Sequence, residues 1–316
     1  MGARGIPVNR RALQRVVPAV VSLGILYWIL RDIDPSTIFD ALTWRVGLVM
    51  VPSLLFYGAV TLWIEAVSLT RPLETVSSMV SKWMAARIKC ASYLLGVVNY
   101  ALGAAALSIL LQRRAGLPLG RAASVVILIS SVDLLVVLGL AGLATAWMQS
   151  GDSAIHAGLL FVALAGFFGG LALLRTPASL GPLDRLRSLS VFEGMRTVPG
   201  ERLAELFGLR ILFAICFVSI CGAAFVAFDV PAPAMQIVAG VLIVAVVAAV
   251  PIAVAGLGTS QAAFLYLFSD YASEATLLAM SLILSAGMLG LRALMGMVFA
   301  REFTQEALRE TRRAPA

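Results

Sequence analysis

Long apolar runs separated by short polar segments dominate the chain. A helix that crosses a bilayer needs about 20 predominantly apolar residues, and most of these runs reach or approach that length. The pattern therefore predicts a membrane protein whose continuous runs form spanning helices. The six continuous runs are Val16–Leu30, Val46–Leu69, Ala122–Trp147, Ile155–Leu174, Leu206–Phe228 and Ala275–Ala300.

Two further apolar stretches are interrupted by residues that break or cap helices. A bilayer tolerates irregular backbone only where protein or water satisfies its polar groups. We therefore predict two re-entrant helices around a buried polar cavity. The broken stretches are Ser78–Leu111, with Asn99 and Gly103, and Ala234–Phe268, with Pro251, Gly256 and Gly258.

The distribution of basic residues predicts the orientation. Segments 1–15, 70–121, 175–210 and 301–316 hold 4, 7, 6 and 4 Lys or Arg residues, which is 21 of the 24 in the chain. Cytoplasmic loops carry an excess of these residues. We therefore expect both termini to be cytoplasmic in the plasma (inner) membrane, with each broken stretch returning to the face that it left.

The sequence contains a weak internal repeat. A shift of 155 positions places Leu102-Gly103 on Leu257-Gly258 and the segment 127–130 on 282–285. The paired spans run in opposite directions in the predicted topology, as in an inverted repeat whose halves meet at broken helices. We expect repeats at about 16–147 and 155–300.

The resulting fold is an all-α polytopic membrane bundle. It has about seven spanning helices and two opposed re-entrant helices, and it resembles a transporter built from inverted repeats. We expect residues 1–316 to form one integral membrane domain, with no soluble catalytic domain.

Composition excludes several functional classes. The chain is 60% apolar and 13% charged, with a net charge of +7, whereas soluble domains are about 25% charged. The positive charge is explained by the membrane-flanking loops, so nucleic acid is not an expected partner. The one histidine and the three cysteines show no metal-ligand spacing. We expect no metal and no cofactor.

The breaks supply the first candidate binding residues. Glycine permits a tight turn, and a hydroxyl or amide can cap a half-helix whose N-terminus attracts an anion such as phosphate. A helical hairpin that binds nothing is the alternative. The candidates are Asn99, Tyr100 and Gly103 at the first break, and Gly256, Gly258, Thr259, Ser260 and Gln261 at the second.

Charged and hydroxylated residues within the spans are further candidates. Asp133 and Arg292 lie on helices that the repeat makes counterparts, and intramembrane charges usually face the bundle interior and pair. We expect these two to interact directly or through water, either at a binding site or as a structural ion pair. Ser130 is a candidate at the same level, although small hydroxylated residues also serve helix packing.

A basic helix is predicted near the cytoplasmic surface. Lys82, Arg87 and Lys89 are expected to face anionic lipid headgroups, each contributing about 1 kcal/mol. The same attraction would serve a gate for a lipid substrate or simple anchoring.

Two segments resemble a known family, the transmembrane region of lysylphosphatidylglycerol synthase and its stand-alone flippase-like relatives. They are Leu110-Leu-Gln-Arg-Arg-Ala-Gly-Leu-Pro-Leu-Gly120 with Ser131-Val-Asp133, and Pro251 with Gly256-Leu-Gly258. Arg292 matches an arginine that often follows the second break. The resemblance covers roughly residues 15–300 and implies a lipid-related membrane protein.

The sequence also departs from the family at charged positions. Ile129-Ser130 stands where a Glu-Arg pair is common, and Gln261 where a glutamate is usual. Less intramembrane charge is therefore expected here than in the family.

Three functions are compatible with these features. The first is movement of an amphipathic lipid, or a lipid-linked intermediate, between leaflets without ATP, because no phosphate-binding loop occurs. Membrane lipids, anionic or phosphate-bearing, would then be the partners. The second is a non-transporting partner subunit of an envelope-lipid or glycan assembly system, with membrane proteins or a second copy as partners. The third, an intramembrane enzyme, is disfavoured because Thr259 replaces the aspartate of a G-x-G-D break.

Overall fold

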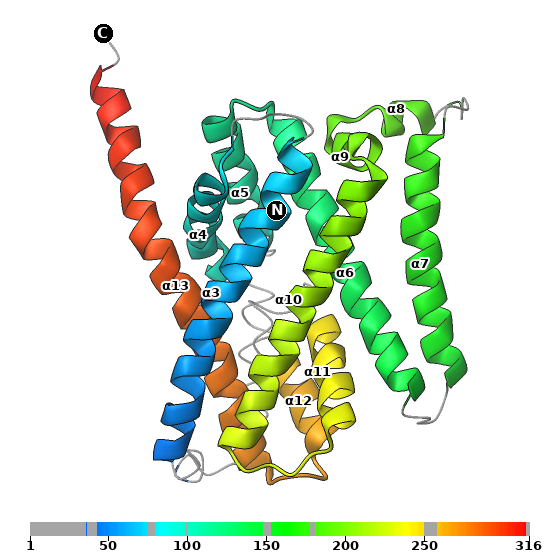
Figure 1. The fold of residues 1–316 in the computed structure, drawn as a ribbon, viewed down its shortest axis with the longest axis vertical. Helices are drawn as coiled ribbons and strands as arrows, with labels where there is room; N and C mark the ends of the chain where they lie inside the picture. Colours follow the sequence, from blue (N-terminus) through cyan, green and yellow to red (C-terminus); the bar gives the residue numbers. More distant parts are fainter. Residues whose placement is uncertain are drawn as a thin grey trace, which may run out of the picture.

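The computed structural model describes Ser36 and residues 43–74, 80–98, 100–147, 153–176, 181, 183–249 and 258–313. Within these ranges the chain forms helices and connecting segments without strands (Figure 1). The main helices are α3 (Trp44–Glu74), α4 (Lys82–Val98), α5 (Tyr100–Ala115), α6 (Leu119–Trp147), α7 (Ser153–Arg175), α10 (Gly200–Ala227), α11 (Ala234–Ala249), α12 (Thr259–Phe268) and α13 (Glu274–Arg313).

Four of the described helices are long and apolar enough to cross a membrane. They are α3, α6 to Ala146, α10, and α13 to Phe299. The prediction of an all-α membrane protein is therefore confirmed. Two of the predicted spans are not among the four: Val16–Leu30 lies outside the described residues, and 155–174 falls within α7. The predicted number of crossings stays a prediction.

Helices α3 and α10 form the centre of the bundle, where they pack along one another (Figure 1). Charged side chains join them at both ends. Arg45, at the start of α3, pairs with Asp229, just after α10. At the other end, four alternating charges form what we call the clamp: Arg71, Glu74, Arg202 and Glu205.

Two helical pairs lie toward opposite ends of the molecule, α4 with α5 and α11 with α12 (Figure 1). The first pair is close because of two glycines: a Cβ added to Gly103 would lie 2.7 Å from the Cα of Gly96. In the second pair, α12 begins directly after Gly258, whose φ of +94° favours glycine. Gly103 and Gly258 therefore have structural roles.

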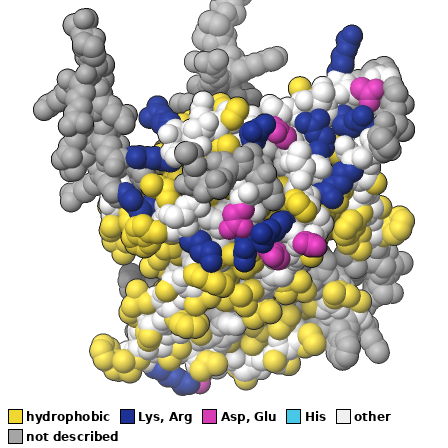
Figure 2. Space-filling model, turned by 45° about the horizontal axis from the view of Figure 1, so that its top comes forward, with side chains coloured by type: hydrophobic (Ala, Val, Ile, Leu, Met, Phe, Trp, Pro, Cys, Tyr) yellow, Lys and Arg dark blue, Asp and Glu magenta, His cyan; other side chains and the backbone are white. Residues whose placement is uncertain are grey.

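One end of the bundle, which we call the basic face, carries several short helices. They are α8 (Leu183–Arg187), a 3-10 turn (Ser190–Phe192) and α9 (Glu193–Thr197). Figure 2 shows Lys and Arg gathered toward this end, with a hydrophobic zone below. Arginines here also bind backbone carbonyls: Arg175 donates to the oxygens of Met195 and Val198, at 2.9 and 2.6 Å. These bonds satisfy polar backbone where the helices end.

Candidate functional site

Two cavities lie inside the bundle. The first, of about 160 Å³, is formed by side chains of α3, α4, α5, α6, α10 and α13. The second, of about 210 Å³, is formed by α10, α11, α12 and α13. Leu289 and Arg292 of α13 line both cavities, so they form part of the wall between them.

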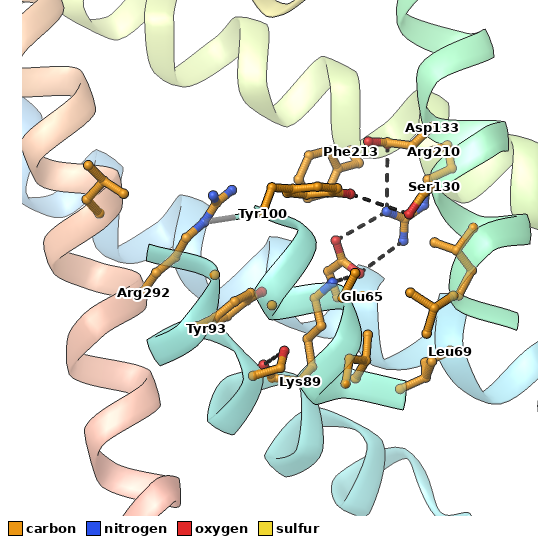
Figure 3. Close-up of a pocket in the computed structure, with 18 residues that line it drawn as sticks. Glu65, Leu69, Lys89, Tyr93, Tyr100, Ser130, Asp133, Arg210, Phe213 and Arg292 are labelled. Carbon is orange, nitrogen blue, oxygen red and sulfur yellow. Dashed lines mark hydrogen bonds and ion pairs between the residues drawn. The ribbon is translucent and has the colours of Figure 1, made fainter. Parts of the chain in front are cut away.

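A buried ion pair lies at the side of the first cavity (Figure 3). Arg210 of α10 donates from Nη1 to Oε1 of Glu65 on α3 at 3.2 Å, and from Nη2 to Oε2 at 3.5 Å. Lys89 of α4 places its Nζ 3.0 Å from Oε2 of the same carboxylate. Glu65 thus joins two cations from two different helices.

Burial explains why these groups are paired. The Arg210 side chain is only 2% exposed and that of Glu65 11%, and an isolated charge at such a site would be strongly unfavourable. The Nε of Arg210 is nevertheless buried without a hydrogen-bond partner among the described residues. Arg210 therefore has more donor capacity than its present partners use.

Asp133 of α6 faces the same cavity but is held more loosely. Its Oδ1 lies 3.7 Å from Nη1 of Arg210, too far for a hydrogen bond, and its side chain is 32% exposed. The direct contact between Asp133 and Arg292, one of the two predicted forms of their interaction, is wrong, because the cation beside Asp133 is Arg210. An interaction through water stays a prediction. The two residues still line one cavity.

Arg292 has aromatic rather than acidic contacts. Its guanidinium carbon lies 5.8 Å from the ring centroid of Tyr93, a distance at which cation–π attraction operates. Among the described residues it forms no ion pair with a carboxylate. It is thus the least neutralised cation of the first cavity.

The residues predicted around the first break also gather here. Tyr100 and Gly103 of α5 line the cavity together with Ser130 of α6. The Oη of Tyr100 and the Oγ of Ser130 are 3.5 Å apart (Figure 3). Asn99 lies outside the described residues.

The second cavity has a different chemistry. Ser260 and Gln261 line it together with Ser281 and Ser285, and Arg292 is its one charged residue among the described lining. Gln261 is fully buried. Its Nε2 donates to the Oγ of Ser285 at 3.0 Å, and its Oε1 accepts from the N–H of Gly258 at 2.6 Å and the Oγ of Ser260 at 3.1 Å. Gln261 therefore holds the start of α12 in place.

The other predictions for the second break are only partly placed. Gly258 is buried at the start of α12, and Thr259 is the first residue of that helix. Neither is among the residues that line the second cavity. Gly256 lies outside the described residues.

The three basic residues of α4 that were predicted to face lipid headgroups do not share one environment. Lys82 is exposed at the start of α4, and Arg87 is partly buried. Lys89 instead points into the first cavity toward Glu65 (Figure 3). Lys82 and Arg87 therefore remain candidates for contact with lipid headgroups, whereas Lys89 is a residue of the cavity.

Sequence reasoning missed the central ion pair. The count of basic residues places Arg210 in the cytoplasmic segment 175–210, although the predicted span Leu206–Phe228 already includes it, and α10 begins still earlier, at Gly200. The available signal was the regular apolar spacing of Leu203 and Leu206 ahead of Arg210. That spacing extends the helix and places the arginine well within it.

The charges of the first cavity define its chemistry. Its lining has the cations Lys89, Arg210 and Arg292 and the carboxylates Glu65 and Asp133, an excess of one positive charge. Such a site suits a group with a single negative charge. Among the described residues, no three His, Cys, Asp or Glu side chains gather where they could hold a metal ion.

Comparison with known proteins identifies the family of the chain. No curated protein matches the chain. The family described as the lysylphosphatidylglycerol synthase transmembrane region matches residues 15–296, and the chain therefore belongs to this family of integral membrane proteins.

Proposed function

We propose that this protein moves an amphipathic lipid with an anionic, phosphate-bearing headgroup between membrane leaflets, without ATP. The observation that carries the proposal is a cavity with one excess positive charge inside an apolar helical bundle. A charge inside a membrane protein commonly marks a substrate pathway. Membership of a lipid-related membrane family supports the same conclusion.

The order and packing of the helices support an inverted repeat. Helices α6 and α13 begin at Leu119 and Glu274, 155 residues apart. Helix α4 of the first half packs against α13, and its counterpart α11 packs against α6. This exchange of partners is expected when two related halves interlock. We infer that α4–α5 and α11–α12 are re-entrant pairs that enter from opposite faces.

Topology completes the proposal. We place the basic face, and both termini, in the cytoplasm at the plasma (inner) membrane, following the excess of Lys and Arg there. Two termini on one side require an even number of crossings. The six continuous apolar runs satisfy this requirement, whereas the seven crossings expected from the sequence do not.

The shared wall suggests a route for the headgroup. An anionic headgroup would enter the first cavity from the cytoplasmic leaflet, pass Arg292 and continue through the second cavity. Arg292 and Leu289 are suited to this role because they line both cavities. The acyl chains would remain in lipid during the passage.

One feature favours a second candidate, a partner subunit that does not transport. Helix α13 continues to Arg313, beyond the apolar part that ends at Phe299, and extends away from the bundle (Figure 1). Such an extension could contact another membrane protein or a second copy of the chain. A flux measurement separates the two functions.

The test is lipid movement in reconstituted vesicles. Fluorescent phosphatidylglycerol in both leaflets is quenched from outside by dithionite, and transport makes the inner pool accessible. We expect wild-type protein to expose this pool, Arg292→Gln to lose most of the flux, and Arg113→Gln, a matched change at an exposed arginine of α5, to retain it. Wild-type flux no faster than in protein-free vesicles would support the partner subunit.

A further inference from the structure

The two carboxylates of the first cavity are neutralised to different degrees. Glu65 lies within 3.2 Å of cations on two helices, Lys89 and Arg210. Asp133 has one cation nearby, Arg210 at 3.7 Å, and shares that guanidinium with Glu65. Asp133 is also the more exposed of the two side chains, at 32% against 11%. It is therefore the carboxylate that cavity water reaches more easily.

The groups that face Asp133 come from every side of the cavity. Asp133 is on α6, and helices α7 and α11 pack against α6. Neither helix adds a charged side chain to the described lining of the first cavity. The titratable, charged and hydroxyl groups around the cavity are Ser130 on the same helix as Asp133, Glu65 of α3, Lys89, Ser92 and Tyr93 of α4, Tyr100 of α5, Arg210 of α10 and Arg292 of α13.

An anion bound in this cavity would come close to Asp133. Arg210 is one of three cations available to it, and Asp133 already lies beside the Nη1 atom of Arg210. Within about 160 Å³, a phosphate group could not contact Arg210 and remain remote from Asp133. Like charges this close repel strongly where little water screens them. A proton on Asp133 would remove the repulsion and add an O–H donor for a phosphate oxygen.

We propose that Asp133 is a proton-binding site coupled to anion binding in the first cavity. The inference rests on the proposed function and adds its energetic coupling. When the anion enters, the Asp133 carboxylate takes one proton from water, and when the anion leaves, that proton is released. Each anionic headgroup that crosses the membrane would then be accompanied by one proton. A proton gradient could thereby drive transport.

Proton uptake on ligand binding tests this directly. Purified full-length protein in neutral detergent would be titrated with dihexanoyl phosphatidylglycerol, whose phosphodiester does not itself titrate near neutral pH. Calorimetry in buffers of different ionisation enthalpy gives the protons bound per ligand. We expect uptake approaching one proton, and an affinity that falls by up to about tenfold per unit rise in pH.

Variants assign the proton. Asp133→Asn should bind the lipid without proton uptake and with little pH dependence, and Asp133→Glu should retain both. Asp270→Asn, the same chemical change in an exposed loop, should behave as wild type. Glycerophosphoglycerol, the same diester without acyl chains, separates a lipid site from a site for the free anion. Dihexanoyl phosphatidylcholine controls for lipid binding without net charge.

The two proposals fail in different ways. Lipid binding by wild type without proton uptake, or unchanged pH dependence in Asp133→Asn, would overturn the proton site and leave the proposed function standing. Absence of any binding of the anionic diesters would overturn both. If Asp133→Asn does not fold, the absence of proton uptake by wild type, or its loss in Asp133→Glu, still overturns the proton site.

Discussion

The two cavities of the bundle share part of one wall but differ in charge. The first brings together five charged side chains from five helices, whereas the second is lined by serines, Gln261 and apolar residues and shares Arg292 with the first. Two neighbouring cavities that share Arg292 therefore differ in chemistry because of the other side chains that line them. We infer that the first cavity selects for a negative charge, while the second admits the group that the first has accepted.

The strongest test of this comparison removes the central charge of the first cavity. Arg210→Leu would leave Glu65 buried with Lys89 as its remaining close cation. We expect a loss of about 3 kcal/mol in the free energy of unfolding, the lower end of the cost of breaking a buried pair, because Lys89 still neutralises part of the Glu65 charge. Thermal unfolding in detergent measures the effect. The double variant Glu65→Leu/Arg210→Leu should recover part of it, because Lys89 then loses its carboxylate, and failure to recover any of it would show that the two residues act separately.

A smaller effect is expected from the polar centre of the second cavity. Gln261→Leu would leave the Gly258 N–H and the Ser285 hydroxyl without their present partner. Buried groups left unsatisfied cost about 1–3 kcal/mol. The same unfolding assay should show this loss, while Ser260→Ala should have little effect. A selective loss of anion binding at unchanged stability would instead make Gln261 a ligand residue and weaken the contrast between the cavities.

The smallest effect should come from an ion pair at one end of α3 and α10. Arg71 and Glu205 of the clamp are 33% and 43% exposed, and exposed pairs contribute about 0.2–1 kcal/mol. A double-mutant cycle with Arg71→Gln and Glu205→Gln measures the coupling, which should decrease in high salt. A coupling energy as large as that of Glu65 with Arg210 would mean that burial does not determine the strength of these two ion pairs.

The helices were largely predictable because each apolar run carries its own signal. Predicted spans 46–69 and 122–147 became α3 and α6, with bounds that differ by a few residues. The boundary of α10 was harder to place, because Arg202 and Glu205 resemble a loop when their partners on α3 are unknown. A polar helix end is recognisable only once its neighbour is known.

The site was partly predictable for a related reason. Residues beside the first break and in the following helix, including Tyr100, Ser130 and Asp133, were expected at one cavity, and they line it. The partner of Asp133 was not predictable, because periodicity shows which face of a helix is buried but not which helix covers it. The sequence also predicted less charge inside the membrane than is usual in the family. Glu65 and Arg210, which are 145 residues apart, nevertheless supply charge to the cavity.

From the charged contacts at both ends of α3 and α10 we infer the depth of the first cavity in the bilayer. Arg45 and Arg71 are separated by about 39 Å along a helix at 1.5 Å per residue, close to the 40–45 Å thickness of a bilayer with its headgroups. The helix pair thus resists vertical sliding, because either end would carry ions into hydrocarbon. Glu65 lies about 9 Å along the helix from Arg71. A lipid could therefore lower its headgroup to this level while its tails stay within their own leaflet, so entry would be sideways from the membrane rather than from the aqueous phase.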